Sequence, residues 1–157
     1  MKVALVSLGC SRTLVDSEVA LGSLLKHGHQ IVKDVESADV AIVNTCGFIE
    51  EAKAESIETI LELCKLKKQG KLSGVVVLGC LAQRYGKEIA DEIKEADAVI
   101  GTNNYGDLAA VLAPLEKKKK VFKVDPRPYY LLDENTPRYS LTPAYMSYVK
   151  ISERRLN

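Results

Sequence analysis

The sequence predicts an α/β fold built on a parallel five-stranded sheet with helices on both faces, followed by an irregular C-terminal tail. Short, continuous apolar runs alternate with longer segments of helical periodicity from residue 2 to residue 113. Continuous rather than alternating apolar runs indicate strands that are buried on both faces. Strictly alternating strands and helices are typical of parallel sheets joined by right-handed crossovers.

The elements can be placed from these patterns. The expected strands are residues 2–8, about 29–32, 39–44, 75–78 and 98–100. The expected helices are about 12–27, 49–68, 82–96 and 105–113, the last of them ended by Pro114. Gly28 and Gly70 suit the positions after the first two helices, where positive φ is common. The natural strand order is 2-1-3-4-5, which makes the sheet flavodoxin-like or Rossmann-like and puts strands one, three and four side by side.

Composition and charge exclude several classes. The net charge of +1 gives no bulk field that points to nucleic acid or membrane. No apolar run approaches the roughly 20 residues that span a bilayer, so we expect no membrane partner. We expect a cytoplasmic protein, in which the four cysteines serve as thiols or metal ligands rather than disulfides.

The chain changes character near residue 125. Residues 1–124 are predicted to form one domain, ending in a possible short strand at 121–124. Residues 125–157 read as a linker with docking tyrosines, followed by the first strand, 148–151, of a further domain that is missing. Such a tail is expected to pack poorly or to form a homo-oligomer, because its aromatic side chains and strand edge lack a partner.

Three cysteines occupy the same kind of position, between an expected strand and the helix that follows it. Cys10, Cys46 and Cys80 each follow an expected strand and precede an expected helix, and each has a glycine neighbour. The ends of parallel strands meet at one edge, so these thiols should lie close together. Thiolates bind soft metals and iron–sulfur clusters. Structural zinc prefers four protein ligands, whereas a 4Fe–4S cluster held by three leaves one iron open.

The neighbouring residues admit a structural and a functional interpretation. Gly9, Gly47 and Gly79 would let backbone approach a bulky cluster. Alternatively, the cysteines are small buried hydrophobes in a flavodoxin-like binding module, although no phosphate-binding glycine motif supports a nucleotide. Cys64 is expected in a helix–sheet core with Ile57, Ile60 and Leu61. The amides near the same edge, expected either to line the site or to cap turns, are Asn44, Gln83, Asn103 and Asn104.

Four stretches carry a family resemblance: residues 6–18, 44–56, 79–85 and 98–105. They resemble the N-terminal domain of the MiaB/RimO family of radical-SAM methylthiotransferases. The likeness covers essentially the whole chain. The run Cys-Gly-Phe-Ile-Glu-Glu-Ala-Lys from Cys46 is most similar to the RimO branch, which modifies an aspartate of a small-subunit ribosomal protein. A tRNA-adenosine methylthiotransferase domain is the alternative within the family.

The resemblance implies that Cys10, Cys46 and Cys80 bind an auxiliary 4Fe–4S cluster that takes part in sulfur insertion. It also implies that the full-length enzyme holds a second 4Fe–4S cluster and S-adenosylmethionine in a following barrel. The motif for that cluster, C-x3-C-x2-C, is absent, and Arg154 to Asn157 stand in its place. We therefore expect a domain truncated before the radical-SAM motif, without catalytic residues of its own and inactive alone.

Overall fold

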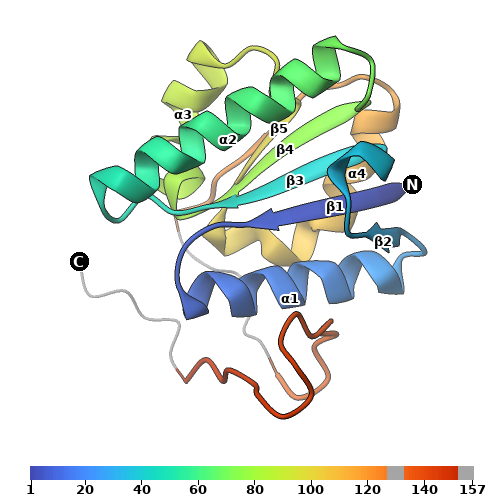
Figure 1. Ribbon diagram of the computed structural model, residues 1–157, viewed down its shortest axis with the longest axis vertical. Helices are drawn as coiled ribbons and strands as arrows, with labels where there is room; N and C mark the ends of the chain where they lie inside the picture. The colour runs from blue at the N-terminus through green and yellow to red at the C-terminus, as the bar shows by residue number, and fades with distance from the viewer. Residues whose placement is uncertain (127–132, 152–157) are drawn as a thin grey trace.

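A computed structural model describes residues 1–126 and 133–151 and confirms the parallel α/β fold (Figure 1). One six-stranded sheet has the order β2-β1-β3-β4-β5-β6, and every pairing is parallel. The strands are β1 (Lys2–Ser7), β2 (Gln30–Val32), β3 (Val40–Thr45), β4 (Gly74–Gly79), β5 (Ala98–Gly101) and β6 (Val121–Lys123). The α-helices are α1 (Ser11–Lys26), α2 (Glu50–Lys68), α3 (Cys80–Glu92) and α4 (Leu108–Glu116), and two 3-10 helices are η1 (Val35–Ser37) and η2 (Thr102–Asp107).

The expected count of five strands is wrong by one. β6 pairs with β5 in parallel, with Ala98 opposite Val121 and Ile100 opposite Lys123. Only three residues form it, directly after a lysine run, so its apolar signal is short. The segment at 121–124 with the composition of a short strand is therefore the sixth strand of the same sheet.

Helices cover both faces of the sheet, as expected. Figure 1 shows α2 and α3 on one side of the strands and α1 and α4 on the other. Every residue of β3 and β4 is buried, because these central strands have neighbours on both edges and helices on both faces. One core lies between the sheet and α1 with α4, around Leu24 and Leu112. The other lies under α2 and α3, around Ile60 and Leu81.

The bounds of α3 and α4 differ from the sequence prediction at both ends. α3 ends at Glu92 rather than at residue 96, and α4 begins at Leu108 rather than at residue 105, because residues 102–107 form η2. α3 begins at Cys80 rather than at residue 82, directly after Gly79, whose φ of 111° ends β4. α4 contains Pro114 and continues to Glu116, because Leu115 still packs into the core. Gly28 and Gly70 have positive φ after α1 and α2, as predicted.

The described part of the tail, residues 133–151, is irregular, as expected, and it is attached to α1 by hydrogen bonds and ion pairs. In Figure 1 it runs along the side of α1 that faces away from the sheet. The predicted strand at 148–151 is wrong: these residues form no strand, and Lys150 instead contacts Asp16 of α1. No residue of 133–151 is buried and its large apolar side chains stay exposed, Tyr145 and Val149 at 89% and 77%, so the segment is attached to α1 by polar contacts and its apolar side chains pack poorly, as expected. Within the described residues, no helix has the length and apolar character that crossing a membrane requires.

Candidate metal centre

The three strand-end cysteines lie at one edge of the sheet. Ser7, Asn44 and Leu78 stand opposite one another near the ends of β1, β3 and β4. Each cysteine follows this row within a few residues, and the three are Cys10, Cys46 and Cys80. The register therefore brings thiols that are far apart in sequence into adjacent loops, which is the placement that their strand-end positions predicted.

The cysteines differ in exposure and in local structure. Cys10 is exposed and occupies the residue before α1, whereas Cys46 follows β3 and is half-buried. Cys80 is the first residue of α3 and is also half-buried. No disulfide involves any cysteine of the chain, all four of which the structure describes. Two of the three thiols therefore stand at a helix N-terminus, where negative charge is favoured.

Glycines bring the cysteine loops into contact with one another. A methyl group at Gly9 would lie 2.9 Å from Cβ and 3.4 Å from Sγ of Cys46, so the first loop rests on the second. A methyl group at Gly47 would lie 2.9 Å from Cα of Leu81, so the second loop rests on the start of α3. Contacts this close exclude any side chain at either position.

Gly79 makes the same kind of contact between β4 and β3. A methyl group there would lie 2.5 Å from the backbone oxygen of Thr45. The sequence predicts that the three glycines make room for a cluster, but the space beside each is filled by a neighbouring loop, helix or strand. Their role in this structure is to let the loops approach each other, which draws the cysteines together indirectly.

The thiols are gathered but do not form a closed metal site. Among residues 1–126 and 133–151, no three His, Cys, Asp or Glu side chains are arranged to hold a metal ion. Metal sites are rarely preformed without their metal, because like donors repel and loops relax. The donor set nevertheless suits a soft metal centre, since three thiols share one edge.

Thr13 governs the surroundings of Cys10. Burial raises the pKa of the Cys10 thiol. Hydrogen bonds from the backbone and hydroxyl of Thr13 and from the Arg12 backbone together lower it by more, so the pKa lies below that of an ordinary thiol. The Thr13 hydroxyl lies 3.6 Å from Sγ of Cys10. The Thr13 carbonyl in turn accepts bonds from Ser17 Oγ at 2.9 Å and from Asn44 Nδ2 at 3.0 Å. The first turn of α1 is thereby tied to β3.

Ser56 of α2 governs the backbone of Cys46. Its buried hydroxyl accepts a hydrogen bond from the Cys46 N–H and donates one to the Cys46 carbonyl, both at 3.1 Å. Thr45, one residue earlier, donates through its hydroxyl to the carbonyl of Leu78 at 2.7 Å. β3 is thus fixed on both sides just where its cysteine leaves the sheet.

Cationic side chains lie beside the second and third loops. Arg84 Nη1 is 3.5 Å from the carbonyl of Gly47, and its guanidinium carbon is 5.8 Å from the centre of the Tyr85 ring. Lys53 of α2 stands 4.4 Å from the same ring centre. These cations join α2 to α3 and place positive charge near the edge, which favours thiolates and an anionic ligand.

The hydrogen bonds of the four amides near the edge connect separate segments of the chain and do not involve the thiols. Asn44 is fully buried in its bonds to α1. The other three converge on Asp125: Gln83 Nε2 and Asn103 Nδ2 donate to its carbonyl at 3.0 and 2.7 Å, and Asn104 bonds both its N–H and its carboxylate. This amide clamp holds the chain where it leaves the sheet.

Cys64 lies away from the edge, in the core under α2, as predicted. It is 4% exposed and packs in the same core as Ile60 and Leu63. Leu61, which was expected in the same stripe, is 45% exposed. Burial raises the pKa of the Cys64 thiol to about 11, which disfavours the thiolate form that metal binding needs.

Sequence reasoning missed three residues that shape the site. Thr13 carried a usable signal, because it is three residues into the helix that Cys10 precedes. Ser56 and Asp125 carried none, since their partners are 10 or more residues away and a single polar residue has no periodicity.

The comparison with known families bears on the same residues. A model of the uncharacterized protein family UPF0004 matches residues 2–101. The chain belongs to this family. The matched part of the UPF0004 chain contains β1 to β5 and all three strand-end cysteines.

Named relatives extend the likeness to nearly the whole UPF0004 chain. It is 47% identical over 153 residues to the ribosomal protein uS12 methylthiotransferase RimO of Clostridioides difficile, covering 98% of this chain and 34% of the relative. The proteins of the same name from Bdellovibrio bacteriovorus and Myxococcus xanthus are each 44% identical, over 155 and 149 residues. Those matches cover 97% and 95% of this chain and 33% and 31% of the relatives. The chain thus spans about a third of the length of the curated relatives it matches.

Proposed function

We propose that this chain is the auxiliary-cluster domain of an enzyme that inserts a methylthio group into an aspartate of ribosomal protein uS12. Residues 1–124 would form the domain, and Cys10, Cys46 and Cys80 would hold a 4Fe–4S cluster. The observation that carries the proposal is the convergence of these three thiols on contacting loops at one sheet edge. The relatives named as uS12 methylthiotransferases support the ribosomal substrate over tRNA.

The chain's own residues would prepare the site for an anionic centre. When bound, such a cluster supplies an iron with no protein ligand, which is open to a sulfur compound. Thr13 lowers the pKa of Cys10 and so favours the thiolate that metal binding needs. Ser56 fixes the backbone from which Cys46 projects, and the helix N-terminus at Cys80 favours negative charge there. Arg84 and Lys53 add positive charge nearby.

The complete reaction would need parts of the enzyme beyond these residues. A second 4Fe–4S cluster and S-adenosylmethionine would generate the radical, and the chain holds no C-x3-C-x2-C motif for them. We therefore expect the 157-residue chain, given S-adenosylmethionine, a reductant and uS12, to form neither methylthiolated product nor 5′-deoxyadenosine. Detection of 5′-deoxyadenosine would contradict this assignment. Self-association through residues 125–157 remains a prediction, which sedimentation equilibrium tests.

Anaerobic reconstitution tests the cluster directly. The chain is incubated with ferrous iron, sulfide and a thiol reductant, desalted, and examined by absorbance and by iron and sulfide analysis. We expect a broad charge-transfer band and about four iron and four sulfide per chain. A chain that retains no iron, or that holds zinc more tightly under the same conditions, would overturn the proposal and favour structural cysteines.

A further inference from the structure

The α1 helix is buried all around its middle. A helix that covers one face of a sheet should bury one side and expose the other, with a period of about 3.6 residues. In α1, however, every residue from 15 to 22 is buried. The sheet, η2 and α4 cover part of this stretch, and the tail lies on the side that faces away from the sheet. We call residues 137–150 of the tail the strap. In Figure 1 the strap lies across the outer side of α1.

Two buried carboxylates of α1 hold the strap. Glu18 is 1% exposed and receives Arg138 in an ion pair at 2.5 Å. Its other carboxylate oxygen accepts the backbone N–H of Leu141 at 2.8 Å, and its carbonyl accepts that of Tyr139 at 2.9 Å. A buried carboxylate needs such partners, and the strap that covers Glu18 also supplies them.

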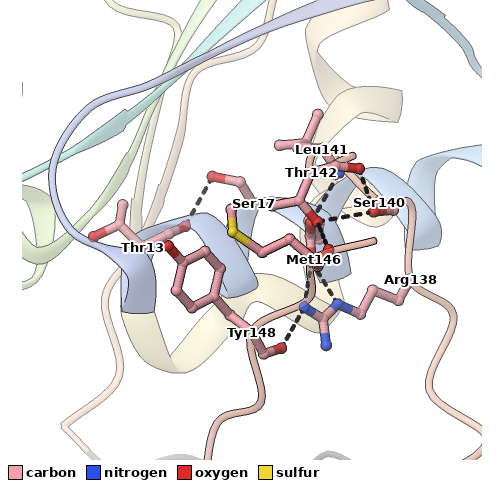
Figure 2. A network of polar contacts seen from close by, with 9 residues as sticks. Thr13, Ser17, Arg138, Ser140, Leu141, Thr142, Met146 and Tyr148 are labelled. Carbon is pink, nitrogen blue, oxygen red and sulfur yellow. Dashed lines mark hydrogen bonds and ion pairs between the residues drawn. The ribbon is translucent and has the colours of Figure 1, made fainter. Parts of the chain in front are cut away.

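Asp16 makes the second attachment. Its carboxylate lies 2.7 Å from Nζ of Lys150, and both side chains are nearly buried, at 5% and 11% exposure. Between the two attachments, Arg138 also donates to the carbonyl of Tyr148 at 2.6 Å, which folds the strap back on itself (Figure 2). The strap is therefore one compact piece fastened at both ends rather than a loose linker.

Gly22 makes room for the strap backbone. A methyl group at Gly22 would overlap the carbonyl group of Pro137 and lie 2.5 Å from the nitrogen of Arg138. Glycine weakens a helix interior, and this close approach of the strap explains its presence in the middle of α1.

The strap grips α1 on either side of the residue that ties α1 to the sheet. Ser17, between Asp16 and Glu18, bonds Thr13 O at 2.9 Å, Asn44 Nδ2 at 2.8 Å and Ser7 Oγ at 3.0 Å. Figure 2 shows Thr13 and Ser17 together with the strap residues. Thr13 in turn contacts the Cys10 thiol. A continuous set of contacts thus runs from the strap through α1 to Cys10.

We propose that the strap sets the position of Cys10 by holding the first half of α1, with Arg138 and Lys150 as positioning residues. The inference rests on the proposed function only for the identity of the ligand that Cys10 binds. The effect of the strap on the position of Cys10 can be tested in the chain without a cluster. Through the contact of Lys150 with Asp16, the strap connects the C-terminal end of the described chain to the helix that follows Cys10.

The test compares thiol labelling in the intact 157-residue chain without cluster. Iodoacetamide modification of Cys10 and of Cys46 is timed in one sample by peptide mass spectrometry, so that their ratio cancels reagent and concentration effects. The variants that remove an attachment are Arg138→Met and Lys150→Met, and Lys150→Arg keeps the charge. The matched control is Lys71→Met, which removes an exposed ion pair to Glu36 at 3.0 Å.

Gly22→Ala separates loss of the strap from damage to α1. Alanine is the better helix former, so this variant strengthens α1 while its methyl group pushes the strap away. Hydrogen exchange at the amides of Tyr139 and Leu141, which bond to Glu18, reports whether the strap has left.

We expect Arg138→Met, Lys150→Met and Gly22→Ala each to speed exchange at these amides and to change the Cys10-to-Cys46 labelling ratio by at least about twofold, the lower end of coupling within one network. Lys150→Arg and Lys71→Met should leave the ratio unchanged. An unchanged ratio in Gly22→Ala and Lys150→Met despite a released strap would overturn the proposal. Exchange at these amides that stays as slow as in the wild-type chain in all three variants would also overturn the proposal, because the strap would then remain docked without the attachments. Failure to bind iron would disprove the proposed function but leave this labelling result intact.

Discussion

The hydroxyl of Ser56 lies 3.1 Å from both the backbone nitrogen and the backbone oxygen of Cys46. One side chain on α2 thus satisfies both polar groups of a residue that has left the β3 ladder. Backbone groups that are part-buried at a strand end need such a partner, because unpaired ones are costly.

Ser56→Ala should therefore destabilise the fold. We expect the free energy of unfolding to fall by about 1–3 kcal/mol, since both Cys46 groups lose their partner inside a buried site. Urea denaturation measures the loss. Ser37→Ala, at an exposed serine of η1, is the control and should change stability by less than about 0.5 kcal/mol. Equal effects of the two variants would contradict the assigned role.

Alanine substitutions should separate ligand cysteines from the core cysteine. Cys10→Ala, Cys46→Ala and Cys80→Ala should each abolish stable iron binding after reconstitution, because a centre with two thiols left is poorly held. Cys64→Ala should retain iron, since this thiol lies in the core. Iron content after desalting is the measurement. Loss of iron in Cys64→Ala together with its retention in Cys10→Ala would reverse the assignment.

Stability should fall at alkaline pH because of Cys64. Its pKa is raised from 9.0 to about 11, so the unfolded chain releases the thiol proton first. The stabilisation is fully present below pH 9.0 and is lost as pH rises through about 11.

Cys64→Ala isolates this effect from other groups that titrate in the same range. At neutral pH the variant should lose about 1–2 kcal/mol of packing. Between pH about 8 and about 10.5, the wild-type chain should lose about 2 kcal/mol more than the variant. Urea denaturation of both chains at the two pH values checks this. Parallel losses in the two chains would show that Cys64 does not titrate as described.

Asp125→Ala should loosen the exit of the chain from the sheet. The buried amide of Asn104 would lose a carboxylate partner, at a cost of about 1–3 kcal/mol in the free energy of unfolding. Asp133→Ala, which removes only exposed bonds within a turn, is the control. Hydrogen exchange in β6 should rise in Asp125→Ala alone, and unchanged exchange there would show that the Asp125 carboxylate does not contribute to the clamp.

The sheet and the cysteine edge were predictable because they depend on repeated local signals. The continuous apolar runs of β1, β3 and β4 each precede a cysteine. Because the strands of a parallel sheet end at one edge, this order alone places the cysteines together. The strap was not predictable in this way. Its contacts join single polar residues across more than 100 positions, as from Glu18 to Arg138, and such pairs leave no periodic trace. Residues 148–151 have strand-forming composition, but the contact of Lys150 with Asp16 determined their place.

The order of the strands along the chain also determines when the three cysteines can first meet during synthesis. Cys10 and Cys46 leave the ribosome with β1 and β3, but the third thiol follows β4 and becomes available only when α3 begins at Cys80. At about 5–20 residues per second, translation from residue 46 to residue 80 takes roughly 2–7 s. During that interval two thiols wait without the third, so any centre that needs all three must be assembled after the fourth strand has emerged and paired.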